Sequence, residues 1–335
     1  MRIAVIGAGS WGTALANLLA GKGEDVTLWA YEPELVERLA ATRVNDLFLP
    51  GITLDRRLAF TNDLAAAVAG REVVVLVAPS QVMRQVVTSL RPHLAAESLL
   101  VSAAKGIEND TLLLMSEVLT EVLGPAVAPR CAYLSGPSFA REVALGLPTA
   151  VTVAALEPEV GQTVQELFRT DYFRVYTNAD VVGVELGGAL KNVIALAAGV
   201  SDGLGFGHNA RAALINRGLV EMARLGAAKG AEAGTFAGLA GMGDLVLTCT
   251  GDLSRNRSVG IELGRGRKLA EILGGMRMVA EGVKTTLSAW QLAQKLGVAM
   301  PITEQMYRIL YEDKDPRQAV SELMQRQQRS EGSSR

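Results

Sequence analysis

The pattern of apolar and polar positions changes near residue 180. Before it, short apolar runs rich in β-branched residues alternate with stretches of helical periodicity, which is typical of buried parallel strands joined by helices. The expected strands are 2–6, 25–29, 72–78, 98–104, 131–134, 149–154 and 172–176. Beyond Asp180 the strand pattern fades, and the expected elements are helices at 184–200, 210–229, 256–264, 267–273, 281–295, 303–311 and 316–327.

A glycine-rich loop follows the first expected strand directly. Residues 7–12 read Gly-Ala-Gly-Ser-Trp-Gly and lead into a helical stretch at 13–20. Glycines here let the backbone approach a pyrophosphate, and N–H groups at the helix N-terminus bind its charge. Because the loop lies inside a βαβ unit of about thirty residues, we predict a dinucleotide site held by Gly7, Gly9 and Gly12 rather than a simple turn.

The residue expected to meet the adenosine ribose lies about twenty positions beyond the last glycine. Glu32 stands there, in Ala30-Tyr31-Glu32-Pro33. Its carboxylate would bind the ribose hydroxyls of NAD and repel the 2′-phosphate of NADP, so the sequence favours NAD. The alternative is that Glu32 is an exposed residue that opens the next helix.

The domain organisation follows from this pattern and from the length of 335 residues, which favours two domains. We predict an α/β N-terminal Rossmann-type domain over 1–180, with a mainly parallel sheet, and an all-α substrate-binding and catalytic domain over 181–325. The polar tail at 326–335 is expected to be disordered.

Composition excludes several classes of function. The net charge of −2 argues against nucleic-acid binding. No uncharged run reaches the length of about eighteen residues that a membrane span needs, and glycines interrupt the N-terminal apolar run too early for a signal peptide. Cys131, Cys249 and the two histidines fit no metal spacing, so no metal site is expected. We expect a cytoplasmic protein.

One cation interrupts the apolar helix expected at 184–200. Lys191 shares a helical face with Gly187, Gly188, Ala195 and Ala198, so this face has room for a ligand or for another backbone. The helix alone leaves two interpretations open. Lys191 is a functional lysine, or it extends its amine to water from a partly buried helix.

Three other charged residues stand at positions that favour function. Lys105 follows the strand 98–104, at the edge where such sheets bind ligands. Asp244 lies in a glycine-rich loop, where it is either a site residue or the cap of the next helix. Arg255 and Arg257 fall in the first turn of a helix that Ser254 caps, where the helix dipole disfavours cations. A bound phosphate would remove this conflict, whereas a solvated arginine turn is the alternative.

In these residues and their order, the sequence resembles the bacterial NAD(P)-dependent glycerol-3-phosphate dehydrogenase family from Gly7 to about Glu312. The opening Gly-Ala-Gly-Ser-Trp-Gly-Thr-Ala-Leu-Ala is characteristic of that family. So are the later segments Ala104–Ile107, Leu134–Ala140, Glu185–Asn192, Ala240–Leu245, Ser254–Asn256 and Ala280–Gly282. The chain departs from many members at Ala30-Tyr31-Glu32, where they carry arginine or histidine.

The resemblance implies a role for each of the matching positions. The cofactor would be lined by Gly7, Gly9, Ser10, Trp11, Gly12, Lys105, Ala140, Arg255, Val279 and Glu281. Glycerol phosphate would be held by Lys105, Gly136, Ser138, Lys191, Asp244, Ser254, Arg255 and Asn256. Lys191 would be the acid–base residue, with Lys105 and Asp244 as its catalytic neighbours.

The reaction implied is the reduction of dihydroxyacetone phosphate to sn-glycerol 3-phosphate, for phospholipid synthesis, by a homodimer that uses NAD or NADP. Lys191 would protonate the alkoxide that hydride transfer creates, with its pKa lowered by burial and by Lys105. The small residues around it would then make space for the substrate and the nicotinamide. The alternatives are a two-domain 3-hydroxyacid dehydrogenase or ketopantoate reductase, or a nicotinamide-sensing protein without catalysis.

Overall fold

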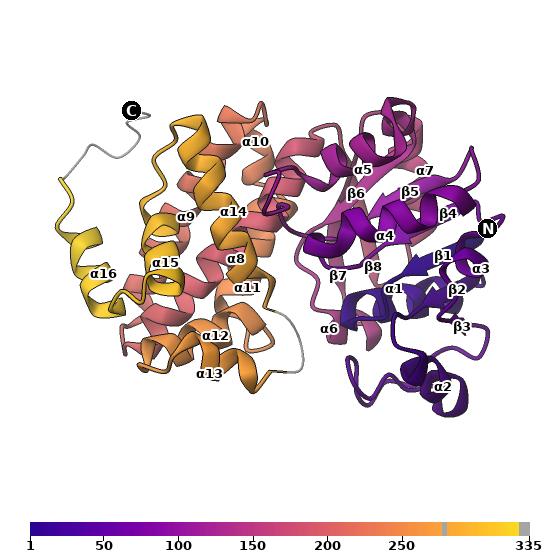
Figure 1. The fold of residues 1–335 in the computed structure, drawn as a ribbon, viewed down its shortest axis with the longest axis horizontal. Helices are drawn as coiled ribbons and strands as arrows, with labels where there is room; N and C mark the ends of the chain where they lie inside the picture. Colours follow the sequence, from indigo (N-terminus) through magenta and orange to yellow (C-terminus); the bar gives the residue numbers. More distant parts are fainter. Residues whose placement is uncertain (277–279, 328–335) are drawn as a thin grey trace.

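The computed structural model describes residues 1–276 and 280–327. A half built on a β-sheet and a helical half lie side by side (Figure 1). The sheet has eight strands in the order β3-β2-β1-β4-β5-β6-β7-β8. Their bounds are β1 Arg2–Ile6, β2 Asp25–Trp29, β3 Ala59–Thr61, β4 Val73–Leu76, β5 Leu99–Ser102, β6 Cys131–Ser135, β7 Thr149–Ala155 and β8 Phe173–Asn178.

The expected mainly parallel sheet is confirmed, with one exception in the direction of its strands. Neighbouring strands pair in parallel except β6 and β7, which are antiparallel. Strand β3 was not predicted, because its three residues at the edge of the sheet are exposed or half-buried and make no apolar run. β1 lies between β2 and β4, so the strand order reverses there. Open sheets of this kind bind ligands beyond that point.

Helices cover both faces of the sheet. They are α1 Ser10–Gly21, α2 Pro33–Thr42, α3 Leu64–Val68, α4 Met83–Leu90, α5 Met115–Leu123, α6 Ala140–Ala144 and α7 Pro158–Phe168. Short 3₁₀ turns lie at Ser80–Val82, Arg91–His93 and Pro125–Arg130. Apolar side chains from the strands and helices form one core on each side of the sheet, which fixes the ends of the strands in space.

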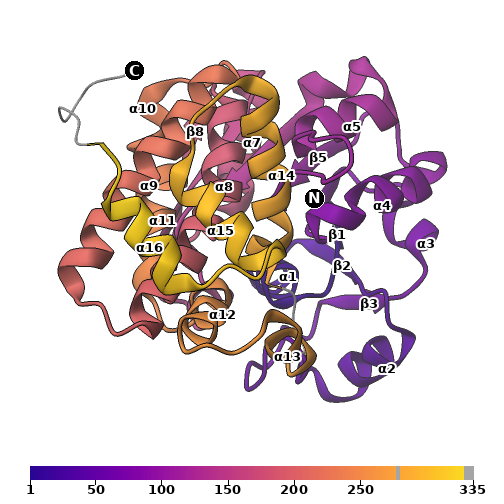
Figure 2. The ribbon, with the colours of Figure 1, turned by 60° about the vertical axis from the view of Figure 1, so that its left-hand side comes forward.

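The helical half is arranged around α8, Val181–Gly203 (Figure 2). Its other elements are α9 His208–Ala228, α10 Ala233–Phe236, a π-helical turn Leu239–Gly243, α11 Asp244–Thr250, α12 Arg255–Gly264, α13 Leu269–Gly274, α14 Glu281–Leu296, α15 Pro301–Tyr311 and α16 Pro316–Met324. α8 is long and apolar enough to cross a membrane, but 89% of its most apolar window is buried within the protein. It is therefore the core helix of this half.

Two helices of this half cross at glycines. A Cβ added at Gly199 of α8 would lie 2.1 Å from the Arg257 carbonyl oxygen of α12. A Cβ at Gly260 of α12 would lie 2.1 Å from the Leu196 oxygen of α8. Gly203 and Gly264 repeat the arrangement one turn along. The backbones are thus in contact, and this contact fixes the start of α12 beside the middle of α8.

The change of pattern near residue 180 coincides with the passage from β8 to α8. The Asp180 carboxylate accepts a hydrogen bond from the Gly183 N–H (2.8 Å) and so caps α8. The division into domains at 180 and 181 stays our proposal. Of the tail expected to be disordered, residues 326 and 327 follow α16 without regular structure, and the remainder lies outside the described residues.

Candidate active site

The glycine loop has the shape that a dinucleotide needs. Gly7 has a φ of 120°, and a Cβ there would lie 2.9 Å from the Val77 carbonyl carbon. A Cβ at Gly12 would lie 1.8 Å from the Gly7 oxygen, so the loop packs tightly against the start of α1. A Cβ at Gly9 would meet nothing within 4 Å, and no side chain caps α1. The residues present therefore fit a pyrophosphate over this helix N-terminus.

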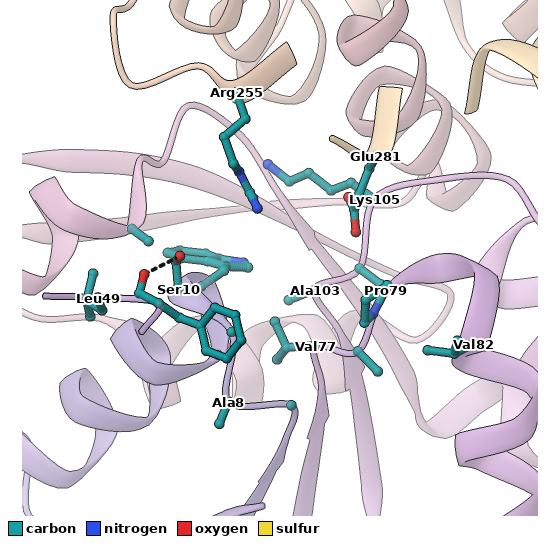
Figure 3. Close-up of a pocket in the computed structure, with 18 of the residues that line it drawn as sticks. Ala8, Ser10, Leu49, Val77, Pro79, Val82, Ala103, Lys105, Arg255 and Glu281 are labelled. Atoms are coloured by element: carbon teal, nitrogen blue, oxygen red, sulfur yellow. Dashed lines mark hydrogen bonds between the residues drawn. The ribbon is translucent and has the colours of Figure 1, made fainter. Parts of the chain in front are cut away.

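A cavity of about 890 Å³ opens beyond the ends of β1, β4 and β5, between the sheet and the helical half (Figure 3). Small-molecule sites span about 300–1,000 Å³. Most of the predicted site residues line it: Gly7, Gly9, Ser10, Trp11, Gly12, Lys105, Ser138, Ala140, Lys191, Ser254, Arg255, Asn256 and Glu281. Glu32 lines it as well, ahead of α2. Val279 lies outside the described residues.

Two lysines meet at one buried carboxylate. Lys191 Nζ lies 2.6 Å from Asp244 Oδ1, and Lys105 Nζ lies 2.7 Å from Asp244 Oδ2. Lys191 is 7% exposed and Asp244 1%. The interpretation in which Lys191 extends its amine to water is therefore wrong. Asp244 is the first residue of α11, and no side chain caps that helix, so the capping alternative for Asp244 is wrong as well.

The electrostatics of this cluster shift the pKa of Lys191 downward and keep Asp244 charged. Burial lowers the pKa of Lys191 to about 8, and Lys105 pushes it in the same direction, whereas Asp244 opposes the shift. Burial by itself would raise the pKa of Asp244, but the two ammonium groups outweigh it and leave that pKa below its ordinary value. Asp244 is thus a charged carboxylate between two lysines.

The glycines beside Lys191 serve packing rather than ligand space. A Cβ at Gly187 would lie 2.5 Å from the Ala240 oxygen, and one at Gly188 would lie 2.6 Å from Ser135 Oγ. The expectation that these residues make room for the substrate and the nicotinamide is therefore wrong at both glycines. Another backbone and a side chain fill the space, which brings β6 and the loop before α11 against the helix that carries Lys191.

The start of α12 faces the cavity with one of its two arginines. Arg255 projects toward Lys105 and Glu281 across the cavity (Figure 3). Arg257 instead forms ion pairs with Asp202 (2.8 Å) and Asp252 (3.0 Å). The Ser254 hydroxyl accepts a hydrogen bond from the Arg257 N–H and caps the helix, as predicted. The solvated arginine turn is therefore wrong for Arg257, which is ion-paired, whereas Arg255 is exposed and the alternative stays open there.

Asn256 lies behind that helix start and joins three helices. Its Nδ2 donates to Asn192 Oδ1 (2.9 Å) on α8, and its Oδ1 accepts from the Gly282 N–H (3.0 Å) on α14. The other predicted substrate residues, Lys105, Gly136 and Ser138, are joined by hydrogen bonds. Lys105 Nζ and Ser138 Oγ both donate to the Gly136 oxygen, at 3.1 and 2.9 Å. Gly136 supports the lysine from behind the cavity wall.

Sequence reasoning missed several residues of the site. Thr248 accepts a hydrogen bond from Lys191 Nζ (3.0 Å), and Asn192 lines the cavity. Thr248 follows Asp244 by four positions, so the spacing on one helix face could have found it. The segment 48–50 forms one lip of the cavity, where the Phe48 oxygen accepts from Ser10 Oγ (2.5 Å). No local pattern signals that contact.

Known proteins resemble the chain over nearly its whole length. The sequence profiles described as NAD-dependent glycerol-3-phosphate dehydrogenase N-terminus and C-terminus match residues 2–160 and 180–321. Proteins named glycerol-3-phosphate dehydrogenase [NAD(P)+] are 67% identical in Syntrophotalea carbinolica, with 99% of both chains covered, and 68% identical in Geobacter metallireducens, with 98% of both covered.

Solved structures agree with these sequence matches. The crystal structure of glycerol-3-phosphate dehydrogenase from Coxiella burnetii has a TM-score of 0.93 and 44% identity, over 97% of this chain and 99% of that one. A ketopantoate reductase from Ralstonia eutropha reaches a TM-score of 0.61 at 17% identity, which is a likeness of fold alone. The chain therefore belongs to the NAD(P)-dependent glycerol-3-phosphate dehydrogenase family and is an oxidoreductase that acts on a CH–OH group with NAD or NADP.

Proposed function

We propose that the enzyme reduces dihydroxyacetone phosphate to sn-glycerol 3-phosphate for phospholipid synthesis, with Lys191 as the acid–base residue. One observation carries the proposal. The Lys191 ammonium is buried against Asp244, at the wall of the cavity that begins at the glycine loop. A ketone reductase needs a proton donor at that place. Lys105 also lines the cavity and binds Asp244, but its side chain is 14% exposed against 9% for Lys191.

A nicotinamide cofactor held at the glycine loop would supply the hydride for the carbonyl carbon of the substrate. Lys191 then donates a proton from Nζ to the alkoxide oxygen, which completes the alcohol and leaves a neutral amine. A pKa of about 8 allows the amine to hold this proton near neutral pH and still release it. Asp244 and Thr248 fix the direction of Nζ through their hydrogen bonds.

The substrate phosphate is assigned to the start of α12. Ser254, Arg255 and Asn256 supply a hydroxyl, a guanidinium and an amide there, and Lys105, Gly136 and Ser138 hold the opposite end. The cofactor would be held by Gly7, Gly9, Ser10, Trp11, Gly12 and Ala140, and by Lys105, Arg255 and Glu281, which line the same cavity. Val279 lies outside the described residues and keeps only the role that the resemblance implies. Lys105 and Arg255 would each contact both the substrate and the cofactor, so the binding of one would affect the binding of the other.

Cofactor choice, location and assembly complete the proposal. NAD is favoured over NADP because the exposed Glu32 carboxylate lines the cavity where a 2′-phosphate would lie. The enzyme acts in the cytoplasm as a homodimer. An initial-rate comparison of NADH and NADPH with dihydroxyacetone phosphate tests the first point, and equal kcat/KM values for the two would contradict it.

The catalytic assignment is tested with Lys191→Ala and with Lys229→Ala as a control, because Lys229 pairs with Glu117 away from the cavity. We expect Lys191→Ala to lower kcat by roughly a thousandfold while NADH still binds, as followed by its fluorescence. Near-normal turnover in Lys191→Ala would refute the role of the lysine. Turnover of a non-phosphorylated acid, without turnover of dihydroxyacetone phosphate, would refute the substrate.

A further inference from the structure

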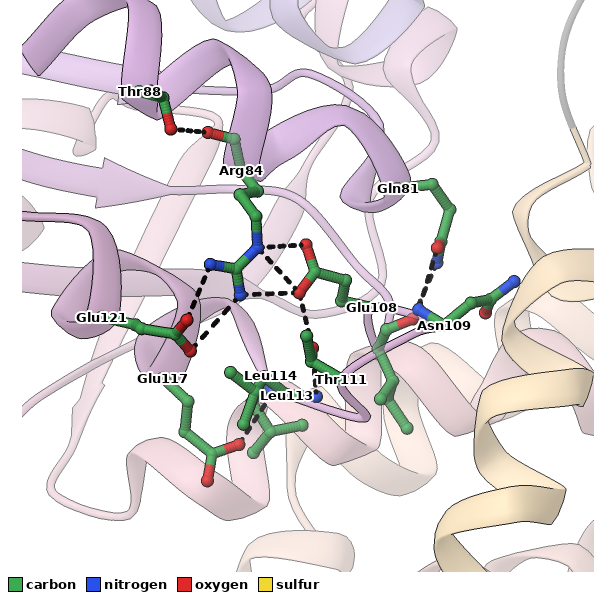
Figure 4. A network of polar contacts seen from close by, with 11 residues as sticks. Gln81, Arg84, Thr88, Glu108, Asn109, Thr111, Leu113, Leu114, Glu117 and Glu121 are labelled. Atoms are coloured by element: carbon green, nitrogen blue, oxygen red, sulfur yellow. Dashed lines mark hydrogen bonds and ion pairs between the residues drawn. The ribbon is translucent and has the colours of Figure 1, made fainter.

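The segment 103–114, between β5 and α5, carries Lys105 and has no helix or strand of its own. Side chains from neighbouring elements hold it (Figure 4). Gln81 Nε2 donates to the Ile107 oxygen (2.7 Å), and Ser288 Oγ of α14 donates to the same oxygen (3.1 Å). The path of the chain just after Lys105 is thus fixed by groups outside the segment.

The strongest of these attachments is an ion pair between a buried carboxylate and an arginine whose side chain is 30% exposed. Arg84 of α4 binds Glu108 in a forked geometry, with Nε 3.0 Å from Oε1 and Nη2 2.8 Å from Oε2. Thr111 Oγ1 donates to Oε2 as well (2.5 Å). Burial alone would raise the pKa of Glu108, but these hydrogen bonds outweigh it and hold the pKa below its ordinary value. The carboxylate is therefore charged and, at 7% exposure, depends on Arg84.

Between Lys105 and Glu108 the backbone has little freedom. A Cβ at Gly106 would lie 2.2 Å from Ser80 Oγ, so the chain is packed against the turn that precedes α4. Lys105 itself ends at Asp244 Oδ2 and at the Gly136 oxygen. Only Gly106 and Ile107 separate Lys105 from Glu108. A movement of Glu108 should therefore displace Lys105 as well.

Helix α4 also connects this ion pair to the cofactor end of the site. Gln85 and Val86 of α4 line the cavity. Arg84, which directly precedes them in the same helix, binds Glu108 instead (Figure 4). We propose that Arg84 and Glu108 are positioning residues, through which the helix that lines the cofactor cavity holds Lys105 against Asp244. The proposal rests on the proposed function, since it requires Lys105 and Lys191 to act on the substrate.

The test compares two carboxylates on the same guanidinium. Glu108→Gln removes the buried charge, and Glu121→Gln is the matched control, because Glu121 binds Arg84 Nη1 (3.0 Å) with a side chain that is 56% exposed. We expect Glu108→Gln to lower kcat by about ten- to a hundredfold, the cost of a catalytic group misplaced by about 1 Å. NADH affinity should be retained, and Glu121→Gln should stay within about twofold of wild type. The kcat of Arg84→Lys should lie between those of Glu108→Gln and Glu121→Gln, because lysine cannot form the forked pair of hydrogen bonds.

A pH profile separates positioning from general damage. The charged groups that face Lys191 are Asp244 of α11, Lys105 and Glu281 of α14, with the Cys249 thiol nearby. Withdrawal of Lys105 removes a cation from this set, so the upper pH limit of the reduction should move to higher pH in Glu108→Gln. A structural defect would lower the rates at all pH values and leave the limit in place, which would overturn the proposal.

The decisive comparison repeats Glu108→Gln in a Lys105→Met background. If Glu108 acts through Lys105, it should have no further effect on kcat there; an equal loss in both backgrounds would overturn the proposal. Should Glu108→Gln not fold, Thr111→Val removes one bond to the same carboxylate and gives the same comparison with a smaller change. Near-normal turnover in Lys105→Met and Lys191→Met would instead refute the proposed function itself, so the two failures are distinguishable.

Discussion

Lys191 and Asp244 form a buried ion pair: Nζ and Oδ1 are 2.6 Å apart, and the side chains are 9% and 1% exposed. The second oxygen of the same carboxylate binds Lys105. One negative charge thus balances part of two positive charges, and in the proposed mechanism the surplus positive charge stabilises the developing alkoxide.

The rate of ketone reduction should depend on pH through Lys191. Its pKa of about 8 means that the proton donor is present below that pH and is lost above it. The kcat for dihydroxyacetone phosphate reduction should therefore fall as the pH rises through about 8, and the kcat for glycerol 3-phosphate oxidation should rise over the same range. Initial rates in both directions at saturating substrate would show this, and a reduction rate that is flat to pH 10 would contradict it.

Asp244→Asn should damage both stability and chemistry. The change leaves two lysines without their counter-charge, which costs about 3–5 kcal/mol for a buried pair. The pKa of Lys191 should fall further, because the attraction that opposes its shift is gone. Urea unfolding measures the first effect, and a shift of the reduction profile to lower pH measures the second. A profile that is unchanged or moved upward would show that Asp244 does not control Lys191.

The crossing of α8 and α12 should be sensitive to a single methyl group. In Gly260→Ala the added Cβ would lie 2.1 Å from the Leu196 carbonyl oxygen of α8. Helix α12 must therefore move, and Arg255 and Asn256 move with it. We expect a loss of about 1–3 kcal/mol in unfolding free energy, as for overpacking, together with a raised KM for the triose phosphate. Gly274→Ala in α13 is the control, because a Cβ there meets nothing within 4 Å.

Two buried glutamates should make stability fall as pH rises. Burial raises the pKa of Glu185 and of Glu221 to about 7, from 4.5 when exposed. The folded state therefore binds more protons than the unfolded state between these values, and the stability present below pH 4.5 is lost as the pH rises to about 7. Each group accounts for about 3 kcal/mol.

The measurement is the unfolding free energy at a series of pH values for wild type, Glu221→Gln and Glu271→Gln. In Glu221→Gln the unfolding free energy should fall less steeply with pH, by the contribution of Glu221, because the amide does not ionise. Glu271 is exposed on α13, so Glu271→Gln should keep the wild-type dependence. The same slope in Glu221→Gln and wild type would show that Glu221 does not titrate in this range.

Much of the fold could be predicted because strong local patterns determine it. Most strands of the first half are apolar runs buried on both faces, β8 alternates buried and exposed residues, and each strand except β3 follows from the sequence. The antiparallel pairing of β6 and β7 has no local signal, because a buried strand has the same composition in either direction. Helix α8 is longer than predicted by about one turn at its N-terminus, where Asp180 caps it.

The site could be predicted residue by residue, but its connections could not. Lys105, Lys191 and Asp244 each stand out in the sequence, yet nothing in it shows that one carboxylate binds both lysines. The glycines beside Lys191 illustrate the limit. Their small size was evident, whereas the partner that occupies the space, Ala240 at Gly187 and Ser135 at Gly188, depends on tertiary packing.

Helix α8 also defines how this enzyme can be redesigned. Three neighbouring elements cover four of its glycines: the π-helical turn Leu239–Gly243 at Gly187, Ser135 at the end of β6 at Gly188, and α12 at Gly199 and Gly203. A side chain added at any of these four would displace the element that covers it. Libraries that seek a new substrate should therefore leave α8 unchanged and vary the lips of the cavity, where the segment 48–50 and Leu253 line the opening.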